Sequence, residues 1–239
     1  MVKTMKIKHY LLSTALCISA AAYSQDFIPA YDRFSGKETS YLTLEDGTKI
    51  EGTLEDLDRR KGLIEEVTIK DANGKKWKFT PDKIKSMYLM PSGFSKFSTN
   101  MDVGTKVKKW DATYIDSEII KKGYAYFEKA NVAVKKEPEM LLMQLLNPGF
   151  NSKIKVFHDP FAAETMRVGF GGMTMAGGDD KSYYVQIGDN VAKKLKKKDY
   201  DDEYKVLYSA CPTLLKKVGE KVRWTEFSKN VYEYTFECQ

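Results

Sequence analysis

Residues 41–54, YLTLEDGTKIEGTL, contain two alternating apolar runs separated by an Asp-Gly pair. Apolar side chains recur at every second position on both sides of Asp46 and Gly47, starting at Leu42 and at Ile50. Alternation with a period of two is typical of a strand with one buried face, and Asp-Gly accommodates the positive φ angles of a tight hairpin turn. The stretch therefore predicts an antiparallel hairpin, and the same pattern extends outward from it.

Residues 36–91 as a whole predict a small β-barrel. A second hairpin covers residues 63–79, LIEEVTIKDANGKKWKF, and turns at its Asn-Gly pair. TPDKI, which follows, indicates one helical turn with proline at its first position, and KSMYLM, residues 85–90, reads as a fifth strand. Five short strands with a helical turn before the last favour an SH3-like barrel. The alternative is two hairpins that lie on a larger sheet.

Residues 92–190 are predicted to form a second antiparallel β region. A long connection, residues 91–116, is rich in Gly, Ser, Lys and Asp. Later stretches have the composition of strands and are separated by Gly-containing turns, which predicts an antiparallel sheet with one covered face. These stretches are GYAYFEKANVAV (123–134), EMLLMQLLN (139–147), SKIKVFHD (152–159), TMRVGFGGMTM (165–175) and SYYVQIG (182–188).

Residues 191–239 predict a tail of three helices packed on the β region. In KDYDDEYKVLYSACP, residues 198–212, large apolar side chains recur at helical spacing and acidic residues occupy the first turn, where the helix dipole favours them. Pro212 ends that helix and can begin the next, TLLKKV, which closes at Gly219. WTEFSKNVYEYTFEC, residues 224–238, predicts the third helix. The chain is therefore predicted to be an α+β protein.

The first 24 residues have the parts of a secretory signal peptide. Lysines precede an uncharged apolar run over residues 11–22, and the small residues Ala22 and Ser24 suit cleavage before Gln25. The run is too short to cross a bilayer, and no later stretch is apolar enough to do so. We therefore predict a signal peptide over residues 1–24 and an exported mature chain in the periplasm or cell envelope, without a transmembrane segment.

Loss of the signal peptide lowers the net charge. Three of the 39 basic residues and none of the 33 acidic residues precede Gln25, so the formal charge falls from +6 to +3. So small an excess does not predict nucleic acid as a partner.

Cleavage would also remove Cys17 and leave two cysteines. In an oxidising compartment, a disulfide between Cys211 and Cys238 is the simplest use of these two thiols. Closing a loop of this length stabilises a protein by about 3.5 kcal/mol in the chain-entropy model. The competing interpretation, Cys211 as a nucleophile, lacks neighbours that would activate the thiol.

Histidine is too rare to support a metal centre of several imidazoles. Only His158 follows the predicted cleavage site, and any Ser-His-Asp or Cys-His device would have to use it. Its neighbour Asp159 is expected to point to the opposite face of a strand. We interpret His158 as a surface residue at a strand end.

Two further motifs lack residues that known ligand-binding loops require. GFGGMTMAGG, residues 169–178, lacks the Lys-Ser/Thr of a P-loop and the third glycine of a dinucleotide loop, so a strand with a bulge is the preferred interpretation. DYDDEY, residues 199–204, lacks the glycine and distal glutamate of a calcium loop. We therefore predict no catalytic residue, metal or cofactor.

The order of these motifs resembles a group of exported proteins of unknown function from Gram-negative bacteria of the Bacteroidota type. The similarity comprises LTLEDGTKIEG (42–52), MLLMQLLNPGFNSKIKVFHDP (140–160), SYYVQIGDN (182–190), the lysine-rich run, KDYDDEYKVLYSACPTL (198–214) and an aromatic C-terminal helix ending in Cys. The resemblance implies a fold and a compartment, and it implies no reaction.

We predict a non-enzymatic binding or scaffolding module whose partner is an envelope protein or glycan. Tyrosine suits such a surface because it combines a large contact area with a polar tip, although a core or half-buried place in the sheet is the alternative for each ring. The lysine run KKLKKKD (193–199) could bind anionic lipid or glycan, or it could protect an edge strand from pairing. A carboxylate-dependent glycan-active enzyme is the other alternative. The candidate surface residues are Tyr124, Tyr126, Tyr183, Tyr184, Lys193, Lys194, Lys196 and Lys197.

Overall fold

The computed structural model describes residues 26–93, 109–134, 137–162 and 181–238. The predicted signal peptide, the predicted strand over 165–175 and the glycine-rich stretch 169–178 lie outside these ranges. No helix within them is long and apolar enough to cross a bilayer.

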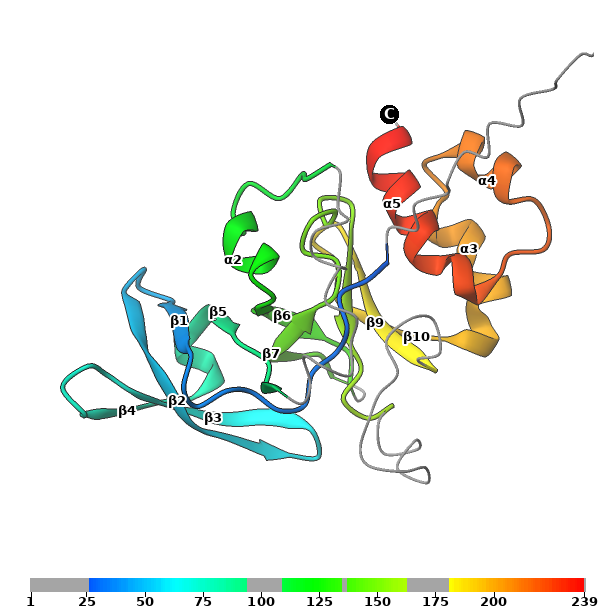
Figure 1. Cartoon of the computed structure of the whole chain (residues 1–239). Coiled ribbons are helices and arrows are strands. Elements are labelled where there is room, and N and C mark those ends of the chain that lie inside the picture. Colours follow the sequence, from blue (N-terminus) through cyan, green and yellow to red (C-terminus); the bar gives the residue numbers. More distant parts are fainter. Residues whose placement is uncertain (1–25, 94–108, 135–136, 163–180, 239) are drawn as a thin grey trace, which may run out of the picture.

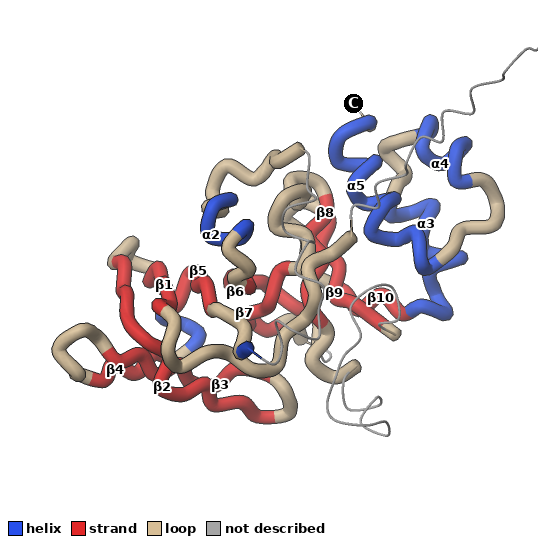
Figure 2. Tube along the Cα trace, viewed as in Figure 1, coloured by secondary structure: helices blue, strands red, loops and turns tan. Residues whose placement is uncertain are grey.

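Ten β-strands in the described ranges form one antiparallel open sheet (Figure 1). Their order across the sheet is β10-β9-β8-β7-β6-β5-β1-β2-β3-β4. Figure 2 shows the strands extending from β4 at one end of the molecule to β9 and β10 near the C-terminal helices. The strands are β1 Thr39–Leu44, β2 Lys49–Arg60, β3 Leu63–Lys70, β4 Lys76–Phe79, β5 Ile84–Leu89, β6 Ala125–Val132, β7 Glu139–Leu145, β8 Ile154–His158, β9 Ser182–Ile187 and β10 Lys193–Lys196.

The first five strands lie where we predicted them. The predicted SH3-like barrel is wrong, because the sheet to which these strands belong is open. A short 3₁₀ helix, Pro81–Lys83, precedes β5 as expected. Strand β5 pairs with β1 on one side and with β6 on the other, so one sheet passes through both predicted β regions. The structure follows the alternative, hairpins on a larger sheet. Local alternation defines a strand's two faces but does not identify the neighbour at its second edge.

A row of paired residues illustrates this continuity. Tyr88 on β5 lies opposite Tyr41 on β1 and opposite Tyr126 on β6. The row continues across the sheet through Leu145, Phe157 and Tyr184 to Lys194.

Each hairpin turn contains a glycine with a positive φ angle, and one of these turns was not predicted. Gly47 and Gly74 have φ angles of 85° and 79°, as expected for the predicted Asp-Gly and Asn-Gly turns. Strands β2 and β3 are joined through Lys61 and Gly62, whose φ angles are 51° and 82°. A Cβ atom on Gly62 would lie 2.8 Å from Cβ of Pro160, so only glycine lets this turn approach that residue so closely.

The C-terminal part contains helices α3 Tyr200–Leu207, α4 Pro212–Val218 and α5 Phe227–Glu237, with short 3₁₀ helices Lys197–Asp199 and Trp224–Glu226 before α3 and α5. The predicted helical tail of residues 191–239 begins too early, because Lys193–Lys196 form the edge strand β10. Helix α2, Ser117–Lys121, was not predicted. It begins where the Asp116 carboxylate accepts hydrogen bonds from the backbone N–H groups of Glu118 and Ile119.

The predicted disulfide is confirmed. The sulfur atoms of Cys211 and Cys238 are 1.97 Å apart and their Cα atoms are 5.5 Å apart. Cys211 directly precedes α4 and Cys238 directly follows α5, so the bond joins the ends of two helices.

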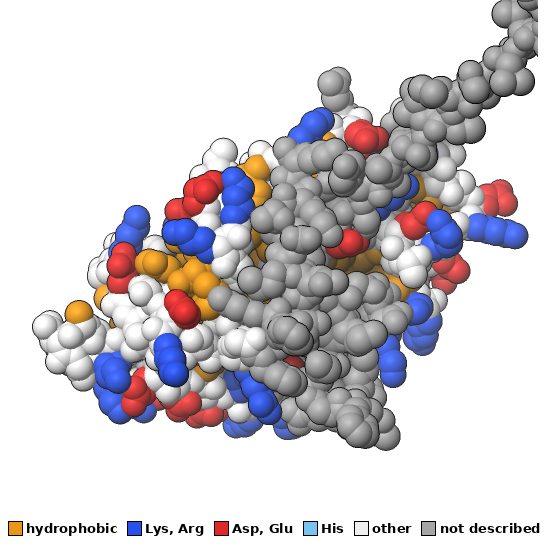
Figure 3. Space-filling model, viewed as in Figure 1, with side chains coloured by type: hydrophobic (Ala, Val, Ile, Leu, Met, Phe, Trp, Pro, Cys, Tyr) orange, Lys and Arg blue, Asp and Glu red, His pale blue; other side chains and the backbone are white. Residues whose placement is uncertain are grey.

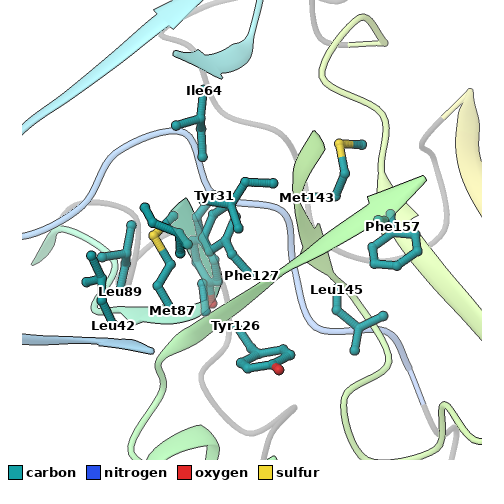
Figure 4. Close-up of a cluster of buried hydrophobic side chains, with 14 of the residues drawn as sticks. Tyr31, Leu42, Ile64, Met87, Leu89, Tyr126, Phe127, Met143, Leu145 and Phe157 are labelled. Carbon is teal, nitrogen blue, oxygen red and sulfur yellow. The ribbon is translucent and has the colours of Figure 1, made fainter. Parts of the chain in front are cut away.

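The buried side chains form two clusters. One cluster fills the part of the molecule around β1 to β7 and includes Met87, Phe127 and Leu145 (Figure 4). The other lies between β8, β9 and the helices, where the Trp224 ring stacks on Phe227 with 5.3 Å between ring centroids. The burial of these rings holds the helices against the end of the sheet.

Candidate functional site

The four tyrosines predicted as a contact surface lie in the core. Tyr124, Tyr126, Tyr183 and Tyr184 are between 1% and 6% exposed. Consecutive Tyr183 and Tyr184 are divided between the two clusters, as expected for strand neighbours. Burial raises the pKa of Tyr124 to about 12 and raises the pKa of Tyr126 and Tyr184 as well. These rings stabilise the fold and present little surface to a partner.

The predicted lysines divide between the two faces of β10. Lys193 shares a face with Leu195, whose side chain packs in the helical cluster. Lys194 and Lys196 share the other face and, with Lys197, line a cavity of about 520 Å³, which we call the lysine pocket. Its lining consists of Asp159, Phe161, Ala162, Lys181, Ser182, Lys194, Lys196, Lys197 and Lys198.

One carboxylate lies at the inner wall of the lysine pocket. Asp159 is fully buried, forms an ion pair with Lys194 at 2.9 Å and accepts a hydrogen bond of 2.6 Å from the Ser182 hydroxyl. The Lys194 ammonium also lies 5.3 Å from the centroid of the Phe161 ring and 5.2 Å from that of Tyr184. Lys194 is therefore held in place by a charge and two rings.

The other lysines of the pocket are less constrained. Within the described ranges, Lys181, Lys196 and Lys197 form no ion pair with a carboxylate. The backbone N–H of Lys197 donates to the carbonyl of Lys181 at 2.9 Å, which holds two of the cationic residues near each other. Figure 3 shows blue side chains gathered beside β10, while Lys, Arg, Asp and Glu are interspersed over the β1–β4 part of the molecule.

A second cavity of about 380 Å³ lies between the β2–β3 turn and the end of β8; we call it the arginine pocket. Its described lining includes three cationic side chains, Arg33, Arg59 and Lys61, together with His158 and one carboxylate, Asp32. The close approach of Gly62 to Pro160 brings the turn over this cavity. The remaining lining is largely apolar and consists of Tyr31, Leu63, Ile64, Phe127, Leu142, Met143 and Gln144.

Arg59 is partly buried, and two contacts orient its guanidinium group. Its Nη1 donates to the backbone carbonyl of Asp32 at 2.8 Å, and its guanidinium carbon lies 5.7 Å from the centroid of the Phe34 ring. Its Nε atom is shielded from solvent and has no hydrogen-bond partner in the described ranges. Burial lowers the pKa of Arg59, while the Asp32 charge opposes this change.

His158 has a similar unpaired atom. The ring is half-buried, and its Nε2 atom is shielded from solvent without a partner among the described residues. Burial lowers the pKa of this imidazole, and the nearby Asp32 and Asp159 carboxylates partly counter the effect. The interpretation of His158 as a surface residue is therefore wrong, because the β2–β3 turn packs against Pro160 and covers this side of the strand end.

The residues at the end of β8 and just after it line the two pockets alternately. His158 and Pro160 line the arginine pocket, whereas Asp159 and Phe161 line the lysine pocket. Alternation at the end of β8 separates His158 from Asp159, and Pro160 and Phe161 lie in the turn that follows. His158 and Asp159 therefore belong to different sites, as the sequence predicted from their adjacency.

Sequence reasoning missed Arg59, Lys61 and His158 as site residues. A signal was present in the run Arg-Arg-Lys-Gly over residues 59–62, where a glycine follows three cations. No group of three or more His, Cys, Asp or Glu side chains within the described ranges is placed to hold a metal ion.

Comparison with protein-family models, with curated proteins and with solved structures finds no match to this chain. The resemblance to exported Bacteroidota-type proteins stays a prediction. The two pockets are therefore interpreted from their own geometry.

Proposed function

We propose that this chain is an exported, non-enzymatic binding protein that holds an anionic glycan at the lysine pocket. The observation that carries the proposal is the charge distribution of this pocket: among the described residues, five lysines and one carboxylate line it, and that carboxylate is buried and paired with Lys194. The excess of ammonium groups favours a ligand that brings negative charge.

The pocket lining also contains apolar surface that suits a sugar ring. Phe161 and Ala162 contribute apolar surface, and the methylene stems of the lysines extend it. A uronic acid or phosphorylated sugar presents a weakly polar ring face together with one or more oxyanions. Such a ligand matches an apolar floor surrounded by ammonium groups, and each ammonium group donates up to three hydrogen bonds.

The carboxylates support binding over hydrolysis. A glycosidase of the usual kind needs two carboxyl groups about 5–10 Å apart on either side of the scissile bond. Within the described part of the chain, each of the two pockets is lined by one carboxylate. Where the described Asp and Glu side chains have resolved pKa shifts, as in Asp71 and Glu226, the shifts are downward, whereas a general acid needs a raised pKa.

Two observations support export. The sequence of residues 1–24 has the pattern of a signal peptide, and disulfides such as Cys211–Cys238 persist mainly in oxidising compartments. We therefore propose the periplasm or the cell envelope as the place of action.

The proposal is tested by retention of the protein on immobilised polygalacturonate, a carboxylated glycan, and on neutral dextran. We expect salt-sensitive retention on polygalacturonate alone, and we expect Lys196→Glu combined with Lys197→Glu to abolish it. The matched control combines Lys37→Glu with Lys49→Glu, an equal charge change at exposed positions near β1 and β2.

Equal loss of retention in both double variants would show that retention depends only on net charge, which would overturn the proposal. Binding to vesicles that contain phosphatidylglycerol, without binding to polygalacturonate, would assign the lysines to a lipid surface instead.

A further inference from the structure

We propose that the arginine pocket is a second, separate site, which binds a small organic molecule with an oxyanion head and an apolar body. The inference does not depend on the glycan ligand of the lysine pocket. It rests on two shielded nitrogen atoms that lack partners among the described residues, on the charges at the rim and on the apolar lining.

The two nitrogen atoms without partners in the described ranges indicate that the pocket lacks a hydrogen-bond acceptor. A buried polar group without a hydrogen-bond partner is costly, and native structures contain few of them. Arg59 Nε is always a donor, and His158 Nε2 is a donor whenever it carries a proton. Arg59 and His158 both line the same cavity of about 380 Å³. An acceptor bound between these two side chains would supply the missing partner.

The arginine already has the geometry for side-on binding. Its Nη1 atom is used by the Asp32 carbonyl, and this contact orients the guanidinium. The opposite edge of the group, formed by Nε and Nη2, is the fork that holds the two oxygens of a carboxylate or phosphate. Because the fork is fixed before binding, little side-chain freedom is lost when an oxyanion arrives.

Two further hydrogen bonds hold in place the backbone segment that leads to Asp32. Gln144 is buried, accepts a hydrogen bond from the backbone N–H of Tyr31 at 3.0 Å and donates one to the carbonyl of Pro29 at 2.8 Å. These bonds fix the segment before Asp32 against β7. Arg33 and Lys61 then add two cations at the rim, which attract a negatively charged ligand.

The remaining lining determines the body of the ligand. Leu63, Ile64, Phe127, Leu142 and Met143 surround the polar groups, and the cavity is larger than an inorganic ion requires. A compact apolar body such as an aromatic ring uses this space, whereas a free inorganic anion leaves it unfilled.

The probes are benzoate and phenyl phosphate, which combine one apolar body with two oxyanion heads, and benzamide, which is neutral. Binding is followed by the imidazole NMR signals of the full chain, and the His158→Gln variant assigns the signal of His158. We expect either anion to shift this signal saturably, with a dissociation constant in the millimolar range or below, and benzamide to leave it unchanged. The stronger of the two anions identifies the preferred head.

Variants separate the proposed contacts. Arg59→Lys keeps the charge but removes the fork, and we expect it to weaken anion binding about tenfold or more. Lys61→Glu, at an exposed position of the turn, is expected to weaken binding without unfolding the protein, and Lys216→Glu on α4 is the charge-matched control. Thermal unfolding of each variant checks that the fold is retained.

The pH dependence gives an independent readout. The charged groups near His158 are Asp32, Arg59 and Asp159, with Arg33 and Lys61 on the same cavity. Because burial lowers the pKa of His158, the ring is neutral at neutral pH and becomes cationic only as the pH falls below its usual range. We expect benzoate affinity to rise as the pH falls, and we expect His158→Gln both to weaken binding and to remove that rise.

Three results would overturn the proposal. They are equal binding of benzamide and benzoate, unchanged affinity in both Arg59→Lys and Lys61→Glu, and the absence of saturable binding by either anion. Salt-sensitive binding that Lys216→Glu reduces as strongly as Lys61→Glu would also overturn it, since the effect would then be one of overall charge.

Discussion

An ion pair at the β4 end of the sheet lies on the surface, whereas an ion pair at the β10 end has a fully buried carboxylate. Arg60 and Glu65 form an ion pair of 2.6 Å while their side chains stay 77% and 41% exposed. Lys194 pairs at 2.9 Å with an Asp159 that solvent does not reach. Exposed pairs contribute little to stability, but removing one partner of a buried pair leaves an uncompensated charge.

The same contrast extends to the covalent and aromatic contacts. The β4 end consists of hairpins whose turns depend on glycine, while the β10 end carries the Cys211–Cys238 bond and a cluster of stacked rings. The two ends should therefore respond to different substitutions, even though one sheet connects them.

The largest effect is expected from the disulfide. Cys211→Ser combined with Cys238→Ser should lower the free energy of unfolding by about 3.5 kcal/mol, because the unfolded chain regains the freedom that the bond removes. Urea unfolding followed by near-UV circular dichroism measures the change, and reduction of the natural protein should reproduce it. An unchanged midpoint in both cases would remove the proposed difference between the two ends.

A smaller effect is expected from the buried ion pair. Asp159→Asn should lower the free energy of unfolding by about 2 kcal/mol, since Lys194 loses its partner while its side chain is only 30% exposed. Replacing Lys194 by Met in the same chain should restore part of the loss. Urea unfolding of the single and double variants provides the measurement.

The control for this prediction lies at the other end of the sheet. Lys76 holds the pKa of the exposed Glu55 carboxyl below its usual value, so any stabilisation exists at neutral pH and is lost as the pH falls through that lowered pKa. Glu55→Gln should leave the midpoint at neutral pH unchanged. Equal destabilisation by Glu55→Gln and Asp159→Asn would contradict the contrast between exposed and buried pairs.

The smallest expected effect is a difference in stability loss between alanine substitutions in two glycine-containing turns. Gly62→Ala and Gly74→Ala should each lower the free energy of unfolding by about 1 kcal/mol, because both residues have positive φ angles. Gly62→Ala should cost about 1 kcal/mol more, because its new methyl group meets Pro160 while the space around Gly74 is open. Urea unfolding compares them, and identical losses would show that the contact with Pro160 adjusts freely.

Much of the fold could be predicted because its signals are local. The turns at Gly47 and Gly74 and the edge strand of lysines each lie within a few residues of sequence. The pairing of Cys211 with Cys238 follows once only two thiols remain in an oxidising compartment. These features need no knowledge of which distant segments meet.

The rest depends on pairings between distant segments. Tyr88 could be assigned to a strand, but nothing near it in sequence indicates that Tyr126 lies opposite its second edge. The arginine pocket is missed for the same reason, because Arg59 and His158 come from β2 and β8 and meet only after the sheet has formed. The lysine pocket was found in part, since four of its lysines belong to one contiguous run.

The strand order also bears on how the chain assembles. Every neighbouring pair in the sheet is consecutive along the chain, except for β5 with β1. Joining consecutive strands closes shorter loops than joining distant ones and so loses less chain entropy. The sheet can therefore grow outward by adding one strand at a time to an existing edge, and only the seam between β1 and β5 requires a strand to return to an earlier partner.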